Sequence, residues 1–334
     1  MIVSEIKSIL ISRTDSIGDV VLTLPMTGVL KKYFPGLKIY FLGKSYTKEV
    51  ILSCIHVDEF LDWDLLLKMG SNEQLLFMKN KKIDCVVHVF PNQAVATIFK
   101  KLKTPFRIGT TNRWFHWFTC NKLISFSRKK SDLHEAQLNF KLLSLFKIAV
   151  PQTQDLIPYF GFEKIKPLSE KHLSLLSRTN KNIILHPKSK GSAREWGLEN
   201  FSSLIVLLLQ NKFSVFISGS EEEGKLVAPL LEIHPEVTSV CGKFSLGEFI
   251  SFISHCDALV AASTGPLHIA SALGKKAIGL YAPMRPIHPG RWAPLGKDSH
   301  AISLEKNCND CKYSQECACI KSISPRQVLE FILQ

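Results

Sequence analysis

Short apolar runs of strand type alternate with helix-length segments along most of this chain, and no other feature constrains the fold as much. Parallel strands need a crossover connection of about a dozen residues or more, which is usually a helix. The pattern therefore predicts an α/β protein with parallel sheets. The predicted strands are Ser8 to Ser12, Lys38 to Leu42, Asp84 to Phe90, Asn182 to His186, Phe213 to Ser218, Asp257 to Ala261 and Lys276 to Tyr281.

The alternation pauses near the middle of the chain. Pro151, Pro158 and Pro167 bracket a stretch with little strand or helix pattern, as expected of a linker. A chain of 334 residues also exceeds what one hydrophobic core usually supports. We predict two domains, residues 1–165 and 166–334. The segment from Pro325 to Phe331 reads as a short helix that packs on the second domain or back on the first.

The charge balance limits the kind of partner. Lys and Arg number 42 against 29 Asp and Glu, which gives a net charge of +13 and favours phosphates, nucleic acid or an acidic membrane surface. No apolar run approaches the roughly 20 residues of a transmembrane helix. The first apolar run, Ile9 to Ile11, is too short for a signal-peptide core. We therefore expect a cytoplasmic protein.

The nine cysteines fall into two groups. Five stand singly in apolar surroundings, as reduced core thiols do: Cys54, Cys85, Cys120, Cys241 and Cys256. The other four lie close together on a polar segment: Cys308, Cys311, Cys317 and Cys319. These four are either reduced loop cysteines, a local disulfide or a structural zinc site.

Two carboxylates follow the first predicted strand. Asp15 and Asp19 flank Gly18 at a strand-to-helix turn, which is where open α/β sheets bind ligands. We expect Asp15 to cap the helix and Asp19 to act as a base. Pro25 interrupts the helical pattern, so the helix should start late or kink there.

Two strand-to-helix segments in the second half suit a phosphate. The loop from His186 to Trp196 carries Lys188, Ser189, Lys190 and Arg194. The second segment, Ser263-Thr264-Gly265-Pro266, has small residues, two hydroxyls and a proline at a helix start, where backbone N–H groups face an anion. A solvated loop and an ordinary capped helix are the competing interpretations.

Three short motifs are interpreted as structural. Gly43-Lys44-Ser45 is not a P-loop, because Lys38 stands where the first glycine of that motif belongs. Asp62-Trp63-Asp64 resembles a cation-binding D-x-D motif but also suits an exposed strand edge. His88 lies between two valines and is expected to be a satisfied core residue.

The stretch from Phe99 to Lys130 is both basic and aromatic. It has nine Lys or Arg residues, seven aromatic residues and no Asp or Glu. Arg107, Arg113, Trp114 and Trp117 are the candidates for contact with an acceptor or an anionic lipid surface. Base stacking on nucleic acid, or aromatics that simply fill the core, are the alternatives.

Taken together, the motifs resemble glycosyltransferase family 9, the bacterial lipopolysaccharide heptosyltransferases, over nearly the whole chain. The resemblance rests on ordered motifs: Ile11 to Pro25, His186-Pro187, Arg194-Glu195-Trp196, Ser263 to Ala270 and Tyr281-Ala282-Pro283. It implies a GT-B fold, in which two Rossmann-like domains face across a cleft. The first domain would bind the acceptor and the second the nucleotide sugar.

The resemblance also implies roles for individual residues. Asp19 matches the base that deprotonates the acceptor hydroxyl, and Arg194 matches the cation that steadies the donor diphosphate. The other implied donor-binding positions are Lys188, Ser189, Glu222, Ser263, Thr264, Gly265 and His268. Glu222 is one of three consecutive glutamates, so its register is open. Ser263 is a departure, because the family commonly has Asp there.

The implied reaction is inverting transfer of heptose from ADP-heptose to a lipopolysaccharide inner-core acceptor. Cations and a helix start would stabilise the departing diphosphate, so no metal or other cofactor is expected. The expected partners are the nucleotide sugar, a lipid-linked oligosaccharide and the anionic inner face of the inner membrane, with no nucleic acid. The alternatives are a GT-B transferase for another nucleotide sugar, a basic nucleic-acid-binding protein and an inactive GT-B scaffold.

Overall fold

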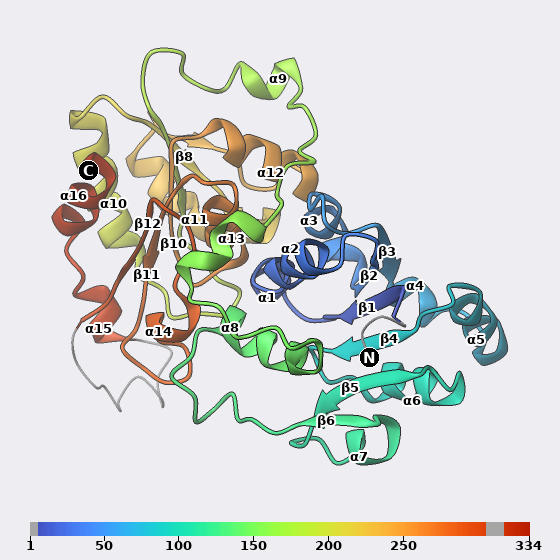
Figure 1. Ribbon diagram of the computed structural model, residues 1–334. Coiled ribbons are helices and arrows are strands. Elements are labelled where there is room, and N and C mark those ends of the chain that lie inside the picture. The colour runs from blue at the N-terminus through green and yellow to red at the C-terminus, as the bar shows by residue number, and fades with distance from the viewer. Residues whose placement is uncertain (1–5, 305–316) are drawn as a thin grey trace. The chain divides into compact units, whose positions relative to one another are not determined.

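The structure is a computed structural model that describes residues 6–304 and 317–334. The chain divides into two compact units, residues 1–164 and 165–334. Figure 1 labels their helices and strands.

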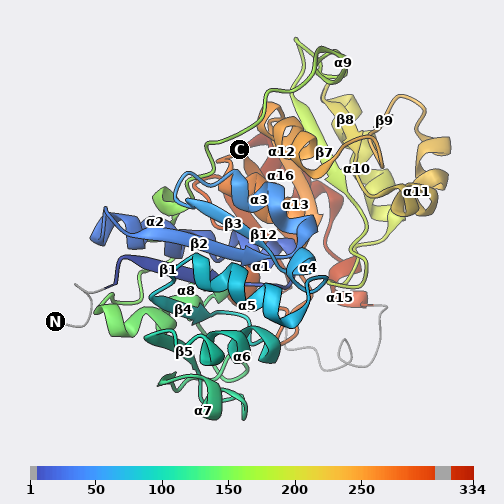
Figure 2. The same ribbon diagram turned by 90° about the vertical axis from the view of Figure 1, so that its right-hand side faces the viewer.

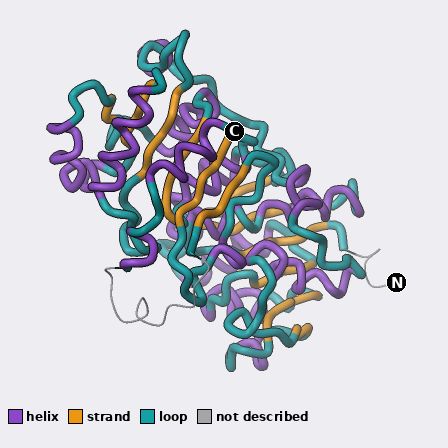
Figure 3. Tube along the Cα trace, turned by 90° about the vertical axis from the view of Figure 1, so that its left-hand side faces the viewer, coloured by secondary structure: helices purple, strands orange, loops and turns teal. Residues whose placement is uncertain are grey.

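The N-terminal unit is built on a six-stranded parallel sheet of order β3-β2-β1-β4-β5-β6. Figure 3 shows helices covering its strands. Its elements are β1 (Ser8–Ser12), α1 (Ile17–Val21), α2 (Leu24–Tyr33), β2 (Lys38–Gly43), the 3₁₀ helix η2 (Ser45–Thr47), α3 (Lys48–Leu52), β3 (Glu59–Asp62), α4 (Trp63–Leu66), α5 (Ser71–Asn80), β4 (Cys85–His88), α6 (Gln93–Lys101), β5 (Phe106–Thr110), α7 (His116–Thr119), β6 (Lys122–Ile124), α8 (Glu135–Phe140) and the 3₁₀ helices η3 (Lys141–Phe146) and η4 (Gln154–Tyr159).

The C-terminal unit contains a second six-stranded parallel sheet, of order β12-β11-β10-β7-β8-β9. Its elements are α9 (Glu170–Leu173), β7 (Asn182–His186), α10 (Leu198–Gln210), β8 (Ser214–Ile217), α11 (Glu221–Ile233), β9 (Thr238–Ser239), α12 (Leu246–His255), β10 (Ala258–Ala262), α13 (Gly265–Ala272), β11 (Lys276–Leu280), α14 (Pro289–Trp292), β12 (Ser299–Ile302), α15 (Ala318–Lys321) and α16 (Pro325–Leu333).

The two sheets share one strand order. Numbered within its own unit, each reads 3-2-1-4-5-6, the order of a Rossmann fold. The direction of the crossovers reverses between β1 and β4 in one sheet and between β7 and β10 in the other. Ligands of open α/β sheets bind beyond the carboxyl ends of the strands at such a reversal. The sheet order therefore points to the residues that follow β1, β4, β7 and β10.

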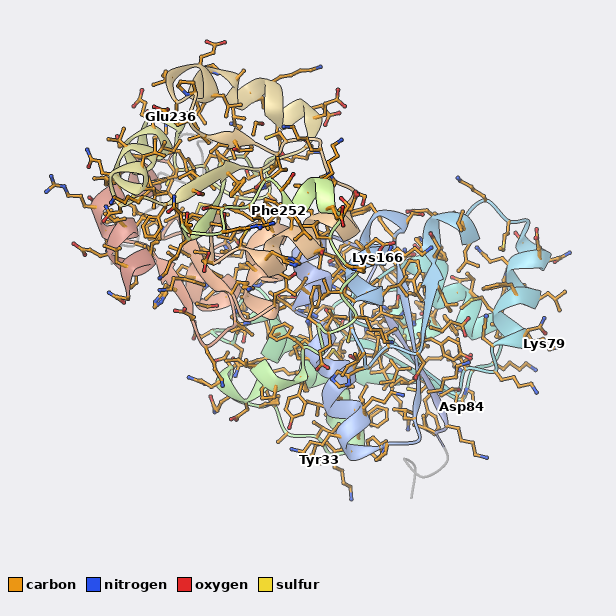
Figure 4. The ribbon with its side chains drawn as sticks, turned by 90° about the horizontal axis from the view of Figure 1, so that it is seen from above. Tyr33, Lys79, Asp84, Lys166, Glu236 and Phe252 are labelled. Carbon is orange, nitrogen blue, oxygen red and sulfur yellow. The ribbon has the colours of Figure 1, made fainter. Side chains whose placement is uncertain are left out.

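The central strands are fully buried and form the cores. Every residue of β1, β4, β7 and β10 is buried, as expected when helices cover both faces of a parallel sheet. At the amino end of β4, the Asp84 carboxylate accepts hydrogen bonds from Ser8 N–H at 2.9 Å and Ser8 Oγ at 3.0 Å. Figure 4 labels Asp84, along with the exposed Tyr33 and Lys79 and the buried Phe252.

The seven strands expected from the sequence are all present, with ends shifted by a residue or two in some. The four edge strands β3, β6, β9 and β12 did not stand out in the sequence, and neither did β5. Residues of edge strands are largely half-buried, so polar side chains interrupt their apolar pattern. The sequence thus revealed the strands that are buried over most or all of their length.

Two local expectations also hold in the structure. The α-helical hydrogen-bond pattern is interrupted at Leu22 and Thr23, and Pro25 occupies the first turn of α2, where its missing N–H removes no helical bond. The C-terminal helix α16 packs on α10 and β11 of its own unit. Over the described ranges, no helix is both long enough and apolar enough to cross a membrane.

His88 is a core residue, but the expectation that it is satisfied is wrong. Its side chain is completely buried, and neither ring nitrogen has a hydrogen-bond partner among the described residues. The rings of His116 and Phe99 lie 5.5 and 6.4 Å from it, centroid to centroid. Burial, together with the nearby His116 and Arg107, lowers the pKa of His88 to about 3. The folded protein therefore holds a neutral imidazole at this position.

This lowered pKa predicts a loss of stability in acid. Below about pH 6.5 the unfolded chain takes up a proton at His88 that the folded state excludes, so the free energy of unfolding falls as pH falls, by about 1.4 kcal/mol per unit. His88→Leu should remove this component. Urea unfolding between neutral pH and about pH 5 measures this. As pH falls, the free energy of unfolding should decrease less in His88→Leu than in the wild type. In the control His255→Gln, at an exposed site, it should decrease as much as in the wild type. Parallel curves for His88→Leu would contradict the assignment.

Candidate functional site

Asp19 lies in the first turn of α1, just beyond the carboxyl end of β1. One carboxylate oxygen accepts from the Arg13 guanidinium and the other from the Ser16 hydroxyl. The Thr23 hydroxyl donates to the Asp19 carbonyl at 2.8 Å, which fixes the backbone of the same residue. The side chain is 18% exposed, so it is held firmly yet stays open to solvent. This is the setting that a positioned base needs.

Arg13 is the centre of a buried ion network. It is 3% exposed, and its guanidinium donates to Asp15 at 2.8 Å and to Glu135 at 3.3 Å, as well as to Asp19. Glu135 is 1% exposed and also accepts from Arg128. The five donors of an arginine fork are what allow one side chain to hold three carboxylates in fixed directions.

Asn139 connects this network to the chain around Asp19. Its side-chain oxygen accepts from Arg13 at 3.4 Å and from Arg128 at 3.1 Å, and its amide nitrogen donates to Thr23 Oγ1 at 3.1 Å. Glu135 and Asn139 lie four residues apart on one face of α8. The α8 helix thus orients Asp19 through Arg13 and Thr23.

The expected role of Asp15 as a helix cap is wrong. Ser16 is the N-cap residue of α1, and the Asp15 carboxylate pairs with Arg13 Nε instead. Burial raises the pKa of Asp15, and the Arg13 guanidinium opposes that rise only in part. The Arg13 guanidinium pairs with Asp15 and Asp19 at the same time. A capping contact to the helix N–H groups would have involved Asp15 alone.

In the C-terminal unit, Glu195 organises the loop that follows β7. Its carboxylate accepts from Lys188 Nζ, from Ser189 N–H at 3.0 Å and from Ser189 Oγ at 3.2 Å. Lys190 and Gly191 both have positive φ, 48° and 79°, so the loop makes a left-handed turn here, a conformation that glycine adopts without strain. The loop lines a cavity of ≈ 350 Å³, with Lys188, Ser189 and Gly191 among its walls.

The three consecutive glutamates have separate roles. Glu223 is buried and forms a reciprocal capping box with Ser220 at the start of α11. Glu222 is exposed, and its carboxylate lies 3.5 Å from Lys190 Nζ of the preceding loop. Of these carboxylates, Glu222 is the one that contacts the cationic loop. His186, at the end of β7, hydrogen-bonds Ser218 at 3.0 Å, and burial lowers the pKa of its ring.

The start of α13 differs from the starts of α11 and α12. Ser220 and Ser245 cap α11 and α12 with full capping boxes. The N-cap residue of α13 is Thr264, which is 6% exposed, and its hydroxyl has no hydrogen-bond partner within residues 6–304 and 317–334. Pro266 follows in the first turn and supplies no N–H. A buried, uncapped hydroxyl at a helix start suits an anionic ligand.

Ser263 and His268 flank this helix start. Ser263 hydrogen-bonds the buried Tyr281 hydroxyl, which donates to the Trp292 carbonyl at 2.5 Å. Burial raises the pKa of Tyr281. His268 is buried one turn into α13, and Arg194 is half-buried in the loop after β7. Ser263 thus joins β10 to the segment that carries α14.

Other predicted residues have structural contacts. Asp62 caps α4 at the end of the edge strand β3 and accepts from Ser45, so the D-x-D interpretation as structural is confirmed. Arg107 donates to the backbone carbonyls of Thr104 and Thr119, the latter at 2.7 Å. Arg113, Trp114 and Trp117 are exposed around α7.

The late cysteines and the metal question are only partly described. Cys317 and Cys319 are buried in the C-terminal core, while Cys308 and Cys311 lie outside the described residues. Within the described parts of the chain, no group of three or more His, Cys, Asp and Glu side chains is arranged to hold a metal ion. Transfer without a metal stays a prediction.

Comparison with known proteins decides the family. The sequence profile of glycosyltransferase family 9 (heptosyltransferase) matches residues 77–320. The chain belongs to glycosyltransferase family 9. This glycosyltransferase is 24% identical to the lipopolysaccharide core heptosyltransferase OpsX of Haemophilus influenzae over 89% of its own length and 84% of the relative. It is 22% identical to the lipooligosaccharide heptosyltransferase 2 of the same organism, over 84% of each chain.

Solved structures support the fold of this glycosyltransferase. The Escherichia coli ADP-heptose LPS heptosyltransferase II matches with a TM-score of 0.75 and 18% identity, over 98% of this chain and 99% of that one. A family 9 glycosyltransferase from Veillonella parvula matches with a TM-score of 0.75 and 21% identity, over 98% and 97%. At these identities the likeness concerns the fold, which is α/β and of the GT-B class.

The sequence analysis did not identify the residues that hydrogen-bond the candidate site residues and hold them in position. In this glycosyltransferase these are Arg13, Glu135, Asn139 and Glu195. The i, i+4 spacing of Glu135 and Asn139 was an available signal, because it places both on one face of α8. Their connection to Arg13 spans more than a hundred residues of sequence, so spacing alone could not reveal it.

The Arg13 network predicts a large effect on stability. Arg13→Met leaves buried carboxylates without their cation and should lower the free energy of unfolding by roughly 3–5 kcal/mol. Lys31→Met, which breaks the more exposed pair with Asp58, is the control and should cost about 0–1 kcal/mol. Chemical denaturation measures both. Similar small losses in the two variants would show that Arg13 is not a structural centre.

Proposed function

We propose that this glycosyltransferase moves a heptose from ADP-heptose to an acceptor sugar of the lipopolysaccharide inner core. The observation that carries the proposal is positional. In each unit, the candidate residues follow the strands at which the crossover direction reverses: Asp19 after β1, the Lys188 loop after β7 and Thr264 after β10. The named functions of the relatives OpsX and lipooligosaccharide heptosyltransferase 2 support the same reaction.

In this proposal the C-terminal unit holds the donor. The diphosphate lies against the Gly191 turn, the start of α13 and the side chain of Arg194. The buried Thr264 hydroxyl supplies a hydrogen bond to a phosphate oxygen, since it has no partner among the described residues. Glu222 is the candidate for a nucleoside hydroxyl, because it is exposed and lies beside the cationic loop. His268 lies one turn further along α13.

Asp19 is the proposed base. As the acceptor oxygen bonds to the anomeric carbon, the hydroxyl proton passes to the Asp19 carboxylate. The bond from the anomeric carbon to the phosphate oxygen breaks at the same time, and its electron pair leaves with ADP. Each oxygen of a carboxylate can accept more than one hydrogen bond, so Arg13 and Ser16 do not exhaust its capacity.

Negative charge on the departing diphosphate is the main demand of this step. Arg194, Lys190 and the N–H groups at the start of α13 are the proposed stabilising groups. Lys188 is already paired with Glu195, so we assign it to the shape of the loop rather than to charge neutralisation. We propose that these groups take the place of a divalent metal ion.

Ser263 favours a second candidate, a transferase for a different nucleotide sugar. The family commonly has Asp at this position, and a hydroxyl cannot provide the same charged contact to a sugar. Here the Ser263 hydroxyl engages Tyr281. A panel of ADP-, UDP- and GDP-sugars tested with one acceptor distinguishes the two candidates.

Asp19→Asn tests the base. The amide cannot take up the acceptor proton, so transfer should fall by about 10²-fold or more. Binding of ADP, measured by calorimetry, should stay close to that of the wild type. Asp15→Asn is the matched control, because it removes the charge of a second carboxylate that pairs with Arg13, and it should retain most activity. Turnover in Asp19→Asn similar to that in Asp15→Asn would remove Asp19 from this role.

Arg194→Ala tests the diphosphate site. Loss of a charged hydrogen-bond donor should weaken ADP binding by roughly tenfold or more. Arg178→Ala, at an exposed cation of the same unit, should leave the affinity unchanged. Isothermal titration with ADP measures both. If Arg194→Ala bound ADP as the wild type does, the phosphate site would lie elsewhere.

A further inference from the structure

The three most exposed aromatic side chains among the described residues lie within one short segment. Trp114, Trp117 and Phe118 are 67%, 60% and 68% exposed. The rings of Trp114 and Phe118 meet edge to face, with centroids 6.4 Å apart. Large apolar side chains gathered on a surface mark an interaction site, whereas single ones do not. We call Trp114, Trp117 and Phe118, with the exposed Arg113, the α7 patch.

The backbone beneath the α7 patch is firmly held. His116 is completely buried, and Thr110 N–H donates to its Nδ1 at 3.0 Å. The Trp117 indole N–H donates to the Thr111 carbonyl at 3.0 Å, and Arg107 donates to the Thr119 carbonyl at 2.7 Å. A β-carbon at Gly109 would lie 2.7 Å from His116, so glycine permits this close packing. The exposed rings are therefore presented by an ordered turn.

The surroundings of the α7 patch are basic. Helix α6 packs against α7 and ends in exposed lysines, Lys100 and Lys101, with Lys103 just beyond. No Asp or Glu occurs between Phe99 and Lys130. In Figures 1 and 2, α7 lies at the margin of its unit, and Figure 1 shows it beside the edge strand β6. The patch thus joins exposed indole and phenyl rings to positive charge.

We propose that the α7 patch docks on an anionic phospholipid bilayer. Tryptophan is favoured at the membrane interface, where its ring meets apolar chains and its N–H stays paired. Lysine and arginine beside such rings attract the anionic headgroups of the membrane surface. This inference rests on the surface alone and does not depend on the proposed sugar transfer.

Two other occupants fit the surface less well. A second copy in a symmetric contact would bring Arg113 and the lysines against their own counterparts, which repel. Stacked bases need open ring faces, and the edge-to-face contact of Trp114 with Phe118 covers part of one. Both alternatives remain outcomes of the test.

The test measures binding of the full chain to vesicles by sedimentation. Vesicles of phosphatidylcholine mixed with phosphatidylglycerol should bind the protein, and salt should weaken the binding. Phosphatidylcholine alone should bind it at least tenfold less. Trp114→Ala with Phe118→Ala should also lower binding at least tenfold, and it leaves Trp117 to report insertion through its fluorescence. Leu65→Ala with Leu67→Ala, at exposed leucines near the opposite edge strand β3, should bind as the wild type does.

Charge reversal completes the design. Lys100→Glu with Lys101→Glu should weaken binding, whereas Lys68→Glu with Lys79→Glu, at exposed lysines near and on α5, should have a smaller effect. The proposal fails if anionic vesicles do not bind the protein, or if the aromatic variant binds as its leucine control does. It also fails if the patch variants abolish dimer formation or binding of single-stranded DNA instead. The vesicles hold no glycolipid, so Asp19→Asn should bind them as the wild type does. A failure of vesicle binding can therefore be told apart from a failure of the proposed sugar transfer.

Discussion

Both units depend on one constraint of parallel sheets, the reversal of crossover direction beside the first strand. β1 and β4 are neighbours in space, as are β7 and β10, although other strands separate them along the chain. Connections from such neighbours leave toward opposite faces of the sheet, so the carboxyl ends between them stay uncovered. Asp19, the Lys188 loop and the start of α13 follow these strands directly. The location of these candidate residues is thus a consequence of strand order.

In each unit, a carboxylate without a predicted catalytic or binding role holds the candidate site residues in position. Glu135, together with Asn139, holds Arg13, and Arg13 holds Asp19. Glu195 holds Lys188 and Ser189. Charges taken out of water are stable only when paired and hydrogen-bonded in good geometry, which makes such contacts directional. The hydroxyl of Thr264 is the contrasting case, because it is buried and has no hydrogen-bond partner among the described residues.

The net charge of +13 does not belong to one surface. Arg13 and Arg128 form the internal network, and Arg107 closes a turn by binding carbonyls. These cations stabilise the fold and are not available to a partner in the way that exposed lysines are. Among the other cations, two groups lie beside candidate binding surfaces: the loop after β7 and the basic surroundings of α7. The first group suits a diphosphate and the second an anionic surface.

The sequence by itself determined the α/β class, the seven most buried strands and the turns that hold the candidate residues, because apolar runs and Gly, Pro and hydroxyl positions are local properties. Asp19, Thr264 and Arg194 stood out as candidates in the sequence, and their roles stay predictions. Only the tertiary structure decided that Asp15 pairs with Arg13, that Glu223 is a cap while Glu222 is exposed, and which aromatic residues face solvent. The edge strands, too, were identified only from the tertiary structure. These features depend on partners distant in sequence, and hydrogen bonds such as that from Arg13 to Glu135 form only when the sheet and α8 are in place.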